Sequence, residues 1–252
     1  MSGLGARIRA SYHRPMSTAP IPNFARPLAT VDLTIFSIQD ERLQVLLVKR
    51  PSARNEPFAD HWALPGGFID LDRDADLEAC AIRKLKEKTN VATPYLEQVG
   101  TWGNAERDPR GWSTTTVYFA LIAADATALL AGGNATDVKW ATVEGNRVRD
   151  KLAFDHTELL RAAVNRLRSK VEYTSLPAFL MPNEFTLTEL QRVYEITLDR
   201  TLEKKAFRTR VLATDLLEEV PRRREGANRP AQLFKLKNRK RTVFFARALQ
   251  RE

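Results

Sequence analysis

The first part of the chain contains short apolar runs separated by polar breaks, a pattern that predicts β-strands. Runs at 29–38, 42–50 and 61–69 are rich in Val, Ile, Leu and Phe, and a polar turn separates the first two. Runs at 114–123 and 137–144 have the same composition. We therefore expect five strands in this part of the chain.

Two further segments carry apolar residues at helical spacing. From Asp74 to Lys88 and over 155–169, apolar positions recur every three or four residues. Asp155 and Glu158 have the spacing of a capping box at the start of the second helix. Because these helices do not alternate regularly with the strands, we expect an α+β fold.

The pattern changes after a segment at 171–185 that contains two prolines and is interpreted as a linker. Thr186 and Glu189 form a capping-box signature for one helix, and a second helix is expected over 202–217. Its inward-facing residues are expected to be Phe207, Val211 and Leu212. Two short β segments around a Gly-Ala-Asn turn follow. This order is typical of a winged helix-turn-helix, which we place at 186–252.

Composition and length agree with a soluble globular protein that has one large domain or two smaller ones, each with a buried core. The chain has 252 residues, of which 43% are hydrophobic and 28% charged, and it has no apolar run of transmembrane length. Residues 1–24 are expected to be a disordered tail, because their start lacks the apolar core of a signal peptide. The single cysteine, Cys80, excludes an internal disulfide. We therefore expect a cytoplasmic protein that does not bind membranes.

The positive charge is concentrated near the C-terminus. Residues 1–170 carry 23 Lys and Arg against 20 Asp and Glu, whereas residues 171–252 carry 17 against 11. This clustering indicates a polyanionic partner, and together with the winged-helix layout it favours double-stranded DNA over a basic protein-interaction surface. The candidates for the major groove are Lys204, Lys205, Arg208 and Arg210. The candidates at the wing are Arg222, Arg223, Arg224 and Arg229.

A glycine pair before the first predicted helix indicates phosphate chemistry. Gly66 and Gly67 let the backbone approach a ligand, and a helix start favours phosphate. Lys84, Glu87 and Lys88 share one face of the helix. Three carboxylates there would hold Mg²⁺, but two lysines attract pyrophosphate instead. We expect ligand binding without a catalytic residue or a metal site, with Glu87 holding Mg²⁺ at most weakly.

The same stretch resembles the Nudix box of nucleoside-diphosphate-linked hydrolases. The residues that match its helical part are Arg83, Leu85 and Glu87. Lys84 and Lys88 replace two glutamates, Asn90 replaces a glycine, and the interval from Gly67 to Arg83 is two residues longer than usual. An exposed ion pair between Arg83 and Glu87 is an equally good interpretation of those two residues. The resemblance implies a nucleotide-binding α/β/α sandwich with a mixed sheet, which we place at 25–170.

A second segment, at 101–121, resembles the Arg-Asp-Pro-Arg region of ADP-ribose-directed Nudix proteins. It implies phosphate contacts from Arg107 and Arg110, and it offers Trp102 among the aromatic residues that can stack on adenine. A structural role remains the alternative for His156. The full set of ligand-binding candidates is Arg50, Gly66, Gly67, Phe68, Arg83, Lys84, Glu87, Lys88, Arg107, Arg110, Trp112, Tyr118 and His156.

A Nudix domain followed by a winged helix resembles the Nudix-related transcriptional regulators of NAD metabolism. The resemblance implies a homodimer that represses NAD biosynthesis or salvage genes and leaves DNA when ADP-ribose or a related nucleotide binds. It requires no cofactor, and Mg²⁺ matters only if hydrolase activity persists. Two alternatives stay open: an active ADP-ribose pyrophosphatase with an accessory nucleic-acid-binding domain, and an RNA-associated binding module.

Overall fold

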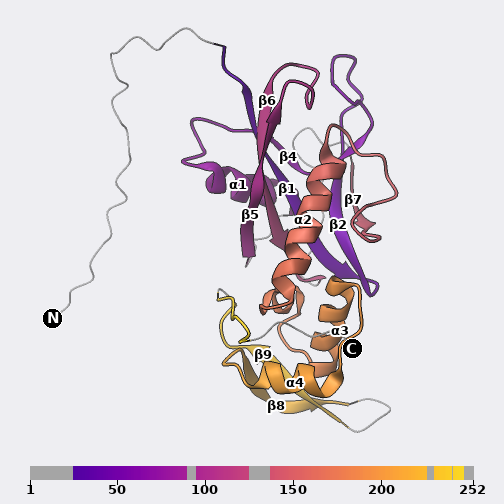
Figure 1. Ribbon diagram of the computed structural model, residues 1–252, viewed down its shortest axis with the longest axis vertical. Coiled ribbons are helices and arrows are strands. Elements are labelled where there is room, and N and C mark those ends of the chain that lie inside the picture. The colour runs from indigo at the N-terminus through magenta and orange to yellow at the C-terminus, as the bar shows by residue number, and fades with distance from the viewer. Residues whose placement is uncertain (1–24, 90–94, 125–136, 226–229, 240, 247–252) are drawn as a thin grey trace, which may run out of the picture.

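The computed structural model describes residues 25–89, 95–124, 137–225, 230–239 and 241–246. A large sheet with helices on its faces occupies one end of the long axis, and a smaller helix-and-hairpin part occupies the other (Figure 1). The expected tail and the Gly-Ala-Asn turn lie outside the described residues. No helix in the described part of the chain is both long and apolar enough to cross a membrane.

The large sheet has seven strands in a mixed arrangement. Its main order is β3-β2-β1-β6-β5, with β4 paired to β1 and β7 paired to β2. Only the β1–β6 pair is parallel among these described pairs, and the others are antiparallel. The strands are β1 Leu28–Gln39, β2 Arg42–Lys49, β3 Trp62–Ala63, β4 Gly66–Phe68, β5 Tyr95–Asn104, β6 Ser113–Leu121 and β7 Asp137–Thr142. The mixed sheet confirms the expected α+β fold.

Two strands differ from the sequence-based expectation. The expected strand at 61–69 is split into β3 and β4 by Leu64 and Pro65. β5 was not expected at all. It contains two glycines and a register shift between Gln98 and Gly100, so its residues do not alternate as a regular strand does.

Two helices cover opposite faces of the sheet (Figure 1). The residues of β1 and β6 alternate between the faces, so Val31, Leu33 and Tyr118 pack with α1 (Leu77–Thr89). Val117 and Phe119 belong to the core on the side of α2 (His156–Val171). The sequence therefore builds a three-layer sandwich.

The expected capping box at the start of α2 is wrong. Asp155 occupies the N-cap position, but its side chain makes no capping hydrogen bond. Its carboxylate instead accepts two hydrogen bonds from Arg107, at 2.9 and 3.0 Å. A buried guanidinium is a stronger partner for this carboxylate than the free amides of the helix.

The second part has the expected winged-helix layout. Its elements are α3 Leu187–Leu198, α4 Lys204–Leu212, β8 Leu217–Arg224 and β9 Ala231–Leu236. The capping box of α3 is confirmed, because Thr186 and Glu189 each accept a hydrogen bond from the other's backbone amide. α4 is shorter than expected. Phe207 and Val211 are buried, but Leu212 is 52% exposed, so its inward placement was wrong.

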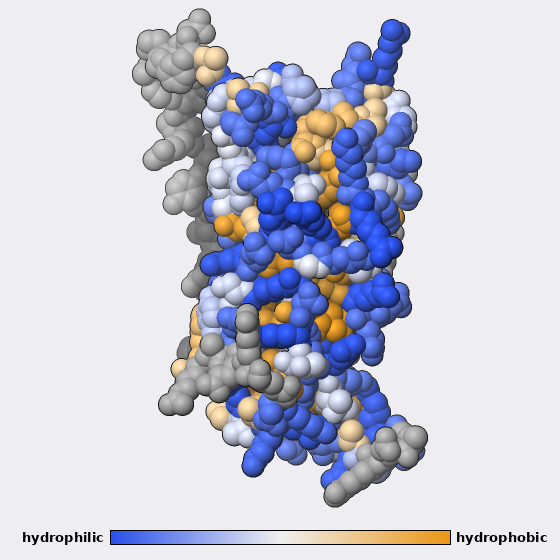
Figure 2. Space-filling view, turned by 45° about the vertical axis from the view of Figure 1, so that its right-hand side comes forward, coloured by the Kyte–Doolittle hydropathy of each residue, from blue (hydrophilic) through white to orange (hydrophobic). Residues whose placement is uncertain are grey.

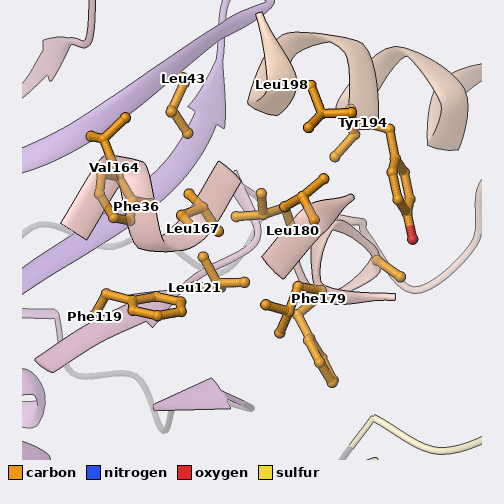
Figure 3. Packing of buried hydrophobic residues seen from close by; sticks show 14 of the residues in the cluster. Phe36, Leu43, Phe119, Leu121, Val164, Leu167, Phe179, Leu180, Tyr194 and Leu198 are labelled. Atoms are coloured by element: carbon orange, nitrogen blue, oxygen red, sulfur yellow. The ribbon is translucent and has the colours of Figure 1, made fainter. Parts of the chain in front are cut away.

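The segment between the two parts is buried. It forms a 3-10 helix, Leu176–Leu180, in which every residue is buried. One apolar cluster continues from the sheet through α2 and this segment into α3, as the side chains of Phe36, Leu167, Leu180 and Tyr194 show (Figure 3). The segment interpreted as a linker is therefore part of a shared core.

The chain also returns to this junction after β9. The amide of Ser175 donates to the carbonyl of Val243 at 2.9 Å, and the amide of Phe245 donates to the carbonyl of Tyr173 at 2.8 Å. Phe245 is buried in the same cluster. Residues 241–246, which we call the C-terminal arm, thus pack against the segment that follows α2.

Candidate nucleotide site and DNA-binding surface

A cavity of about 270 Å³ lies at the edge of the sheet where β4, the end of α1 and the start of α2 meet. It brings together nine of the thirteen ligand-binding candidates. These are Arg50, Gly66, Gly67, Phe68, Lys84, Lys88, Arg107, Arg110 and His156. The remaining four, Arg83, Glu87, Trp112 and Tyr118, do not line it.

The glycine pair is required by close approaches at this cavity. A Cβ atom at Gly66 would lie 2.1 Å from Oδ1 of Asp32, which is an impossible contact. Gly67 has a φ of +140°, and a Cβ there would lie 3.1 Å from Nζ of Lys84. The absence of side chains at these positions lets a carboxylate and an ammonium group lie against the backbone.

Lys84 and Lys88 bring positive charge to the cavity from one face of α1. Lys88 is only 6% exposed, and burial lowers its pKa, with a smaller raising effect from Glu87 and a smaller lowering effect from Lys84. A phosphate group in the cavity would stabilise both charged amines. This end of the cavity therefore suits a diphosphate.

Arg83 and Glu87 form an ion pair, which was the alternative to a ligand-facing role for these two residues. Arg83 donates to Glu87 at 3.1 Å, and its fork donates twice to Asp74, at 2.6 Å each. The guanidinium holds the pKa of Asp74 well below its usual range. Asp74 was not among the candidate site residues, although an acidic residue at the start of an expected helix was a signal for such a partner.

The described residues contain no group of three or more His, Cys, Asp or Glu side chains arranged to hold a metal ion. Glu87 has cationic neighbours in place of further carboxylates. Arg73 lies 3.9 Å away and Lys84 lies 4.0 Å away, in addition to Arg83. Divalent cations need several oxygen ligands, which these basic side chains cannot provide.

Arg107 is part of the cavity wall. Its side chain is 5% exposed, and its fork is occupied by Asp155. A third nitrogen donates to the hydroxyl of Ser113 at 3.3 Å. Arg107 therefore ties the loop before β6 to the start of α2, and each of its three guanidinium nitrogens already has a protein partner.

His156 and Asp32 lie together at the buried side of the cavity. Nδ1 of His156 accepts a hydrogen bond from the amide of Leu64 at 2.9 Å, so Nε2 carries the proton of the neutral ring. Burial lowers the pKa of His156, which favours that neutral ring. Nε2 lies 3.8 Å from Oδ1 of Asp32. Asp32 was missed, although a charged residue within an apolar strand was a visible signal.

Aromatic rings and guanidinium groups form another part of the cavity lining. Arg110 lies over Phe68 at 5.1 Å from the ring centroid, and Arg50 lies over Phe154 at 4.7 Å. Phe154 has a φ of +53°, an unusual conformation for a bulky residue that is found preferentially at functional sites. Phe154 was not selected from the sequence. These flat groups can stack on a nucleobase.

The other aromatic candidates lie elsewhere. Tyr118 is buried in the core beneath α1, and Trp102 packs against the α2-side core. Trp112 is 52% exposed and lies outside the cavity lining. The position of Tyr118 in the core follows from strand alternation, because odd and even positions of β6 point to opposite faces of the sheet.

The DNA-binding candidates lie on α4 and the wing. Lys204 and Lys205 are exposed, whereas Arg208 donates to the hydroxyl of Thr188 at 3.1 Å and Arg210 is half-buried. Arg223 is exposed. Arg229 lies outside the described residues. The surrounding surface is mainly hydrophilic on the face shown in Figure 2.

Two wing arginines are paired with acidic residues near the start of α3. Arg222 donates to both carboxylate oxygens of Glu184 at 2.6 Å each, and Arg224 pairs with Glu189. These ion pairs fix the base of the wing on α3. They also reduce the positive charge that these two arginines present to a partner.

Comparison with known proteins agrees with this division. Residues 29–163 match the family model of the NUDIX domain, and residues 177–236 match that of the NrtR DNA-binding winged helix domain. An ADPR responsive transcriptional repressor NtrR of Acinetobacter baylyi is 49% identical over 213 residues, which cover 84% of this chain and 83% of the relative.

Two solved structures of Shewanella oneidensis NrtR are also similar. The one complexed with a 27mer DNA is 42% identical, has a TM-score of 0.79, and covers 88% of this chain and 99% of that chain. Its NUDIX domain complexed with ADP ribose is 44% identical, has a TM-score of 0.53, and covers 59% of this chain and 94% of that chain.

Proposed function

This chain belongs to the NrtR family of transcriptional regulators, and from that premise we propose that it is a DNA-binding repressor of NAD biosynthesis or salvage genes. Its Nudix domain senses ADP-ribose or a related nucleotide. The observation that carries this proposal is the cavity with a glycine pair and two lysines, in a chain that also has a basic winged helix.

The cavity holds the nucleotide without a metal ion. Lys84 and Lys88 bind the diphosphate together with the backbone at Gly67, and the rings of Phe68 and Phe154 receive the base. Hydrolysis in Nudix proteins would require carboxylates to hold Mg²⁺ against the diphosphate. On this proposal the chain has no primary enzymatic activity, and Mg²⁺ is not needed for sensing.

The winged helix binds an operator as part of a homodimer in the cytoplasm. Lys204 and Lys205 at the start of α4 approach the major groove, and Arg223 on the wing contacts phosphate. A two-fold dimer places two such helices on the half-sites of a palindromic operator. Binding of the nucleotide releases the DNA.

Fluorescence anisotropy with a duplex from the chain's own upstream region tests this function. We expect nanomolar binding that weakens steeply with salt, because phosphate contacts release counterions. Addition of ADP-ribose should release the duplex, whereas adenosine should not. Failure to bind any candidate operator duplex would contradict the proposal.

The alternative function is that of an ADP-ribose pyrophosphatase, which is consistent with the match to the NUDIX family model. An AMP-release assay with ADP-ribose and Mg²⁺ or Mn²⁺ separates the two functions. We expect turnover far below that of an active Nudix hydrolase. Rapid metal-dependent release of AMP would show that the cavity hydrolyses ADP-ribose and would contradict a purely sensing role.

A further inference from the structure

The three residues of β4 each lie against a different chemical group in the cavity. Gly66 lies against the carboxylate of Asp32, and Gly67 lies against the ammonium group of Lys84. Phe68 carries the guanidinium of Arg110 over its ring. Successive residues of a strand are about 3.3 Å apart, so the carboxylate, the ammonium group and the ring with its guanidinium follow one another as a row along β4.

This row matches the chemical order of ADP-ribose. The ammonium group in the middle suits the diphosphate, and the ring with its guanidinium suits the base. A carboxylate repels phosphate but accepts hydrogen bonds from sugar hydroxyls. On the basis of the proposed nucleotide sensing, we propose that Asp32 binds the hydroxyl groups of the terminal ribose and thereby sets a preference for ADP-ribose over ADP.

The carboxylate of Asp32 is held in place for this role. It lies on β1 between β4 and β6, with Asp32 paired to Gly66 on one side and to Val117 on the other. The hydroxyl of Thr115 donates to Oδ2 at 2.8 Å. A side chain fixed by both neighbouring strands loses little freedom when a ligand binds.

Asp32 also retains acceptor capacity toward the cavity. Its neighbours, Arg107 and the neutral ring of His156, are each 3.8 Å away, beyond hydrogen-bond distance. The side chain is 8% exposed, and the residue lines the cavity. A carboxylate accepts about four hydrogen bonds, so hydroxyl groups of a sugar can bind alongside Thr115.

A purely structural role for Asp32 makes a different prediction. If Asp32 only balanced the charge of Arg107, its removal would disturb the cavity wall and weaken every ligand alike. If it binds the terminal ribose, its removal weakens ADP-ribose and spares ADP, which lacks that sugar. The ratio of the two affinities therefore separates the roles.

Calorimetric titration of the full chain with ADP-ribose and with ADP measures this ratio. We expect wild type to prefer ADP-ribose by at least about tenfold, and Asp32→Asn to reduce that preference by about tenfold with ADP affinity within about twofold of wild type. Asp72→Asn, an exposed carboxylate outside the cavity, should behave as wild type.

Two results would overturn the assignment. They are an unchanged affinity ratio in Asp32→Asn, which includes an equal loss of both ligands, and equal affinity of wild type for ADP-ribose and ADP. The comparison of the two ligands in wild type needs no variant, so equal affinities would overturn the assignment even if Asp32→Asn does not fold. Wild type that binds neither ligand would overturn the proposed nucleotide sensing as well, whereas binding of both with equal affinity would overturn the role of Asp32 alone.

Discussion

At the scale of single residues, the proposed function makes Lys84 the residue that determines which ligand the cavity attracts. Its ammonium group lies over the backbone of Gly67, and the buried amine of Lys88 adds a second positive charge on the same helix face. Such a pair attracts an anionic nucleotide directly. A carboxylate at the same position would instead need a metal ion to bridge it to the phosphates.

Lys84→Glu should therefore weaken ADP-ribose binding in the absence of divalent metal by about tenfold or more, because an attraction becomes a repulsion. Mn²⁺ should restore part of the affinity in the variant but not change that of wild type. Lys86→Glu is the matched control, since Lys86 is exposed on the same helix and outside the cavity. Calorimetry measures the affinity for ADP-ribose in each variant. An equal loss of affinity in both variants would show that only the net charge of the protein, and not the position of Lys84, affects binding.

Arg107 has a different kind of importance, because it stabilises the cavity wall. Arg107→Met should lower the free energy of unfolding by about 3 kcal/mol, since Asp155 and Asp32 would remain beside the cavity without their cation. Urea denaturation measures this change. Arg149→Met, which breaks an exposed pair with Glu144, should leave the urea midpoint of unfolding almost unchanged. Similar costs for both variants would contradict the structural role of Arg107.

Asp32 and Phe154 show why the composition of the cavity could only partly be predicted. The glycine pair and the lysines were recognisable, because their chemistry follows from local spacing. Asp32 lies within an apolar strand, and only the pairing of β1 with β4 brings it to the cavity. Phe154 depends on an unusual backbone angle that residue type does not indicate.

At the scale of elements, α4 and the wing divide the basic residues into two groups. Lys204 and Lys205 are exposed at the start of α4, while Arg222 and Arg224 are paired with acidic residues near α3. Contacts to phosphate require cations that are accessible. We therefore expect the lysines to contribute more to DNA affinity than those two arginines.

Lys205→Gln should weaken binding to specific and random duplexes alike, because we place its ammonium group on a phosphate at the edge of the major groove, and a phosphate contact carries no sequence information. The slope of log affinity against log salt should become shallower by about 0.9 if one phosphate contact is lost. Anisotropy titrations over a range of salt concentrations give this slope. Arg222→Gln serves as the comparison and should change the slope less. A larger change of slope in Arg222→Gln than in Lys205→Gln would show that the wing, and not α4, makes the main phosphate contact.

The elements also separate what local patterns predict from what tertiary contacts decide. β1, β2, β6 and both winged-helix helices followed from apolar spacing and capping residues. β5 escaped notice because two glycines and a bulge interrupt its alternation, and only its pairing with β6 makes it a strand. The cap expected at Asp155 failed because a distant arginine binds that carboxylate.

At the scale of the whole molecule, the two parts share one apolar core. Phe179 in the 3-10 helix is 2% exposed and stacks on Tyr95 of β5 at a centroid distance of 5.5 Å. The same cluster includes Tyr194 of α3 (Figure 3). Packing of this kind couples the unfolding of neighbouring elements.

Phe179→Ala should lower the free energy of unfolding by about 3–5 kcal/mol and affect both parts together. All four tryptophans lie before residue 171, so their fluorescence reports on the sandwich, while hydrogen exchange of α3 reports on the winged helix. We expect both signals to shift. Phe244→Ala, at a 65% exposed side chain, is the control and should change stability by less than about 1 kcal/mol. A shift in only one signal would mean that the parts unfold independently.

The C-terminal arm has a consequence for how this chain can be divided in the laboratory. Because Val243 and Phe245 bind the residues that follow α2, the described end of the chain lies beside the end of the sandwich. A protease nick within 177–185 would leave these contacts in place, so the two fragments would stay associated. Truncation at residue 171 would instead uncover Leu167 and Val171 to water. A fragment meant to isolate either function should therefore not simply end where the two family matches meet, between residues 163 and 177. It is better designed to keep the contacts between the C-terminal arm and the residues that follow α2.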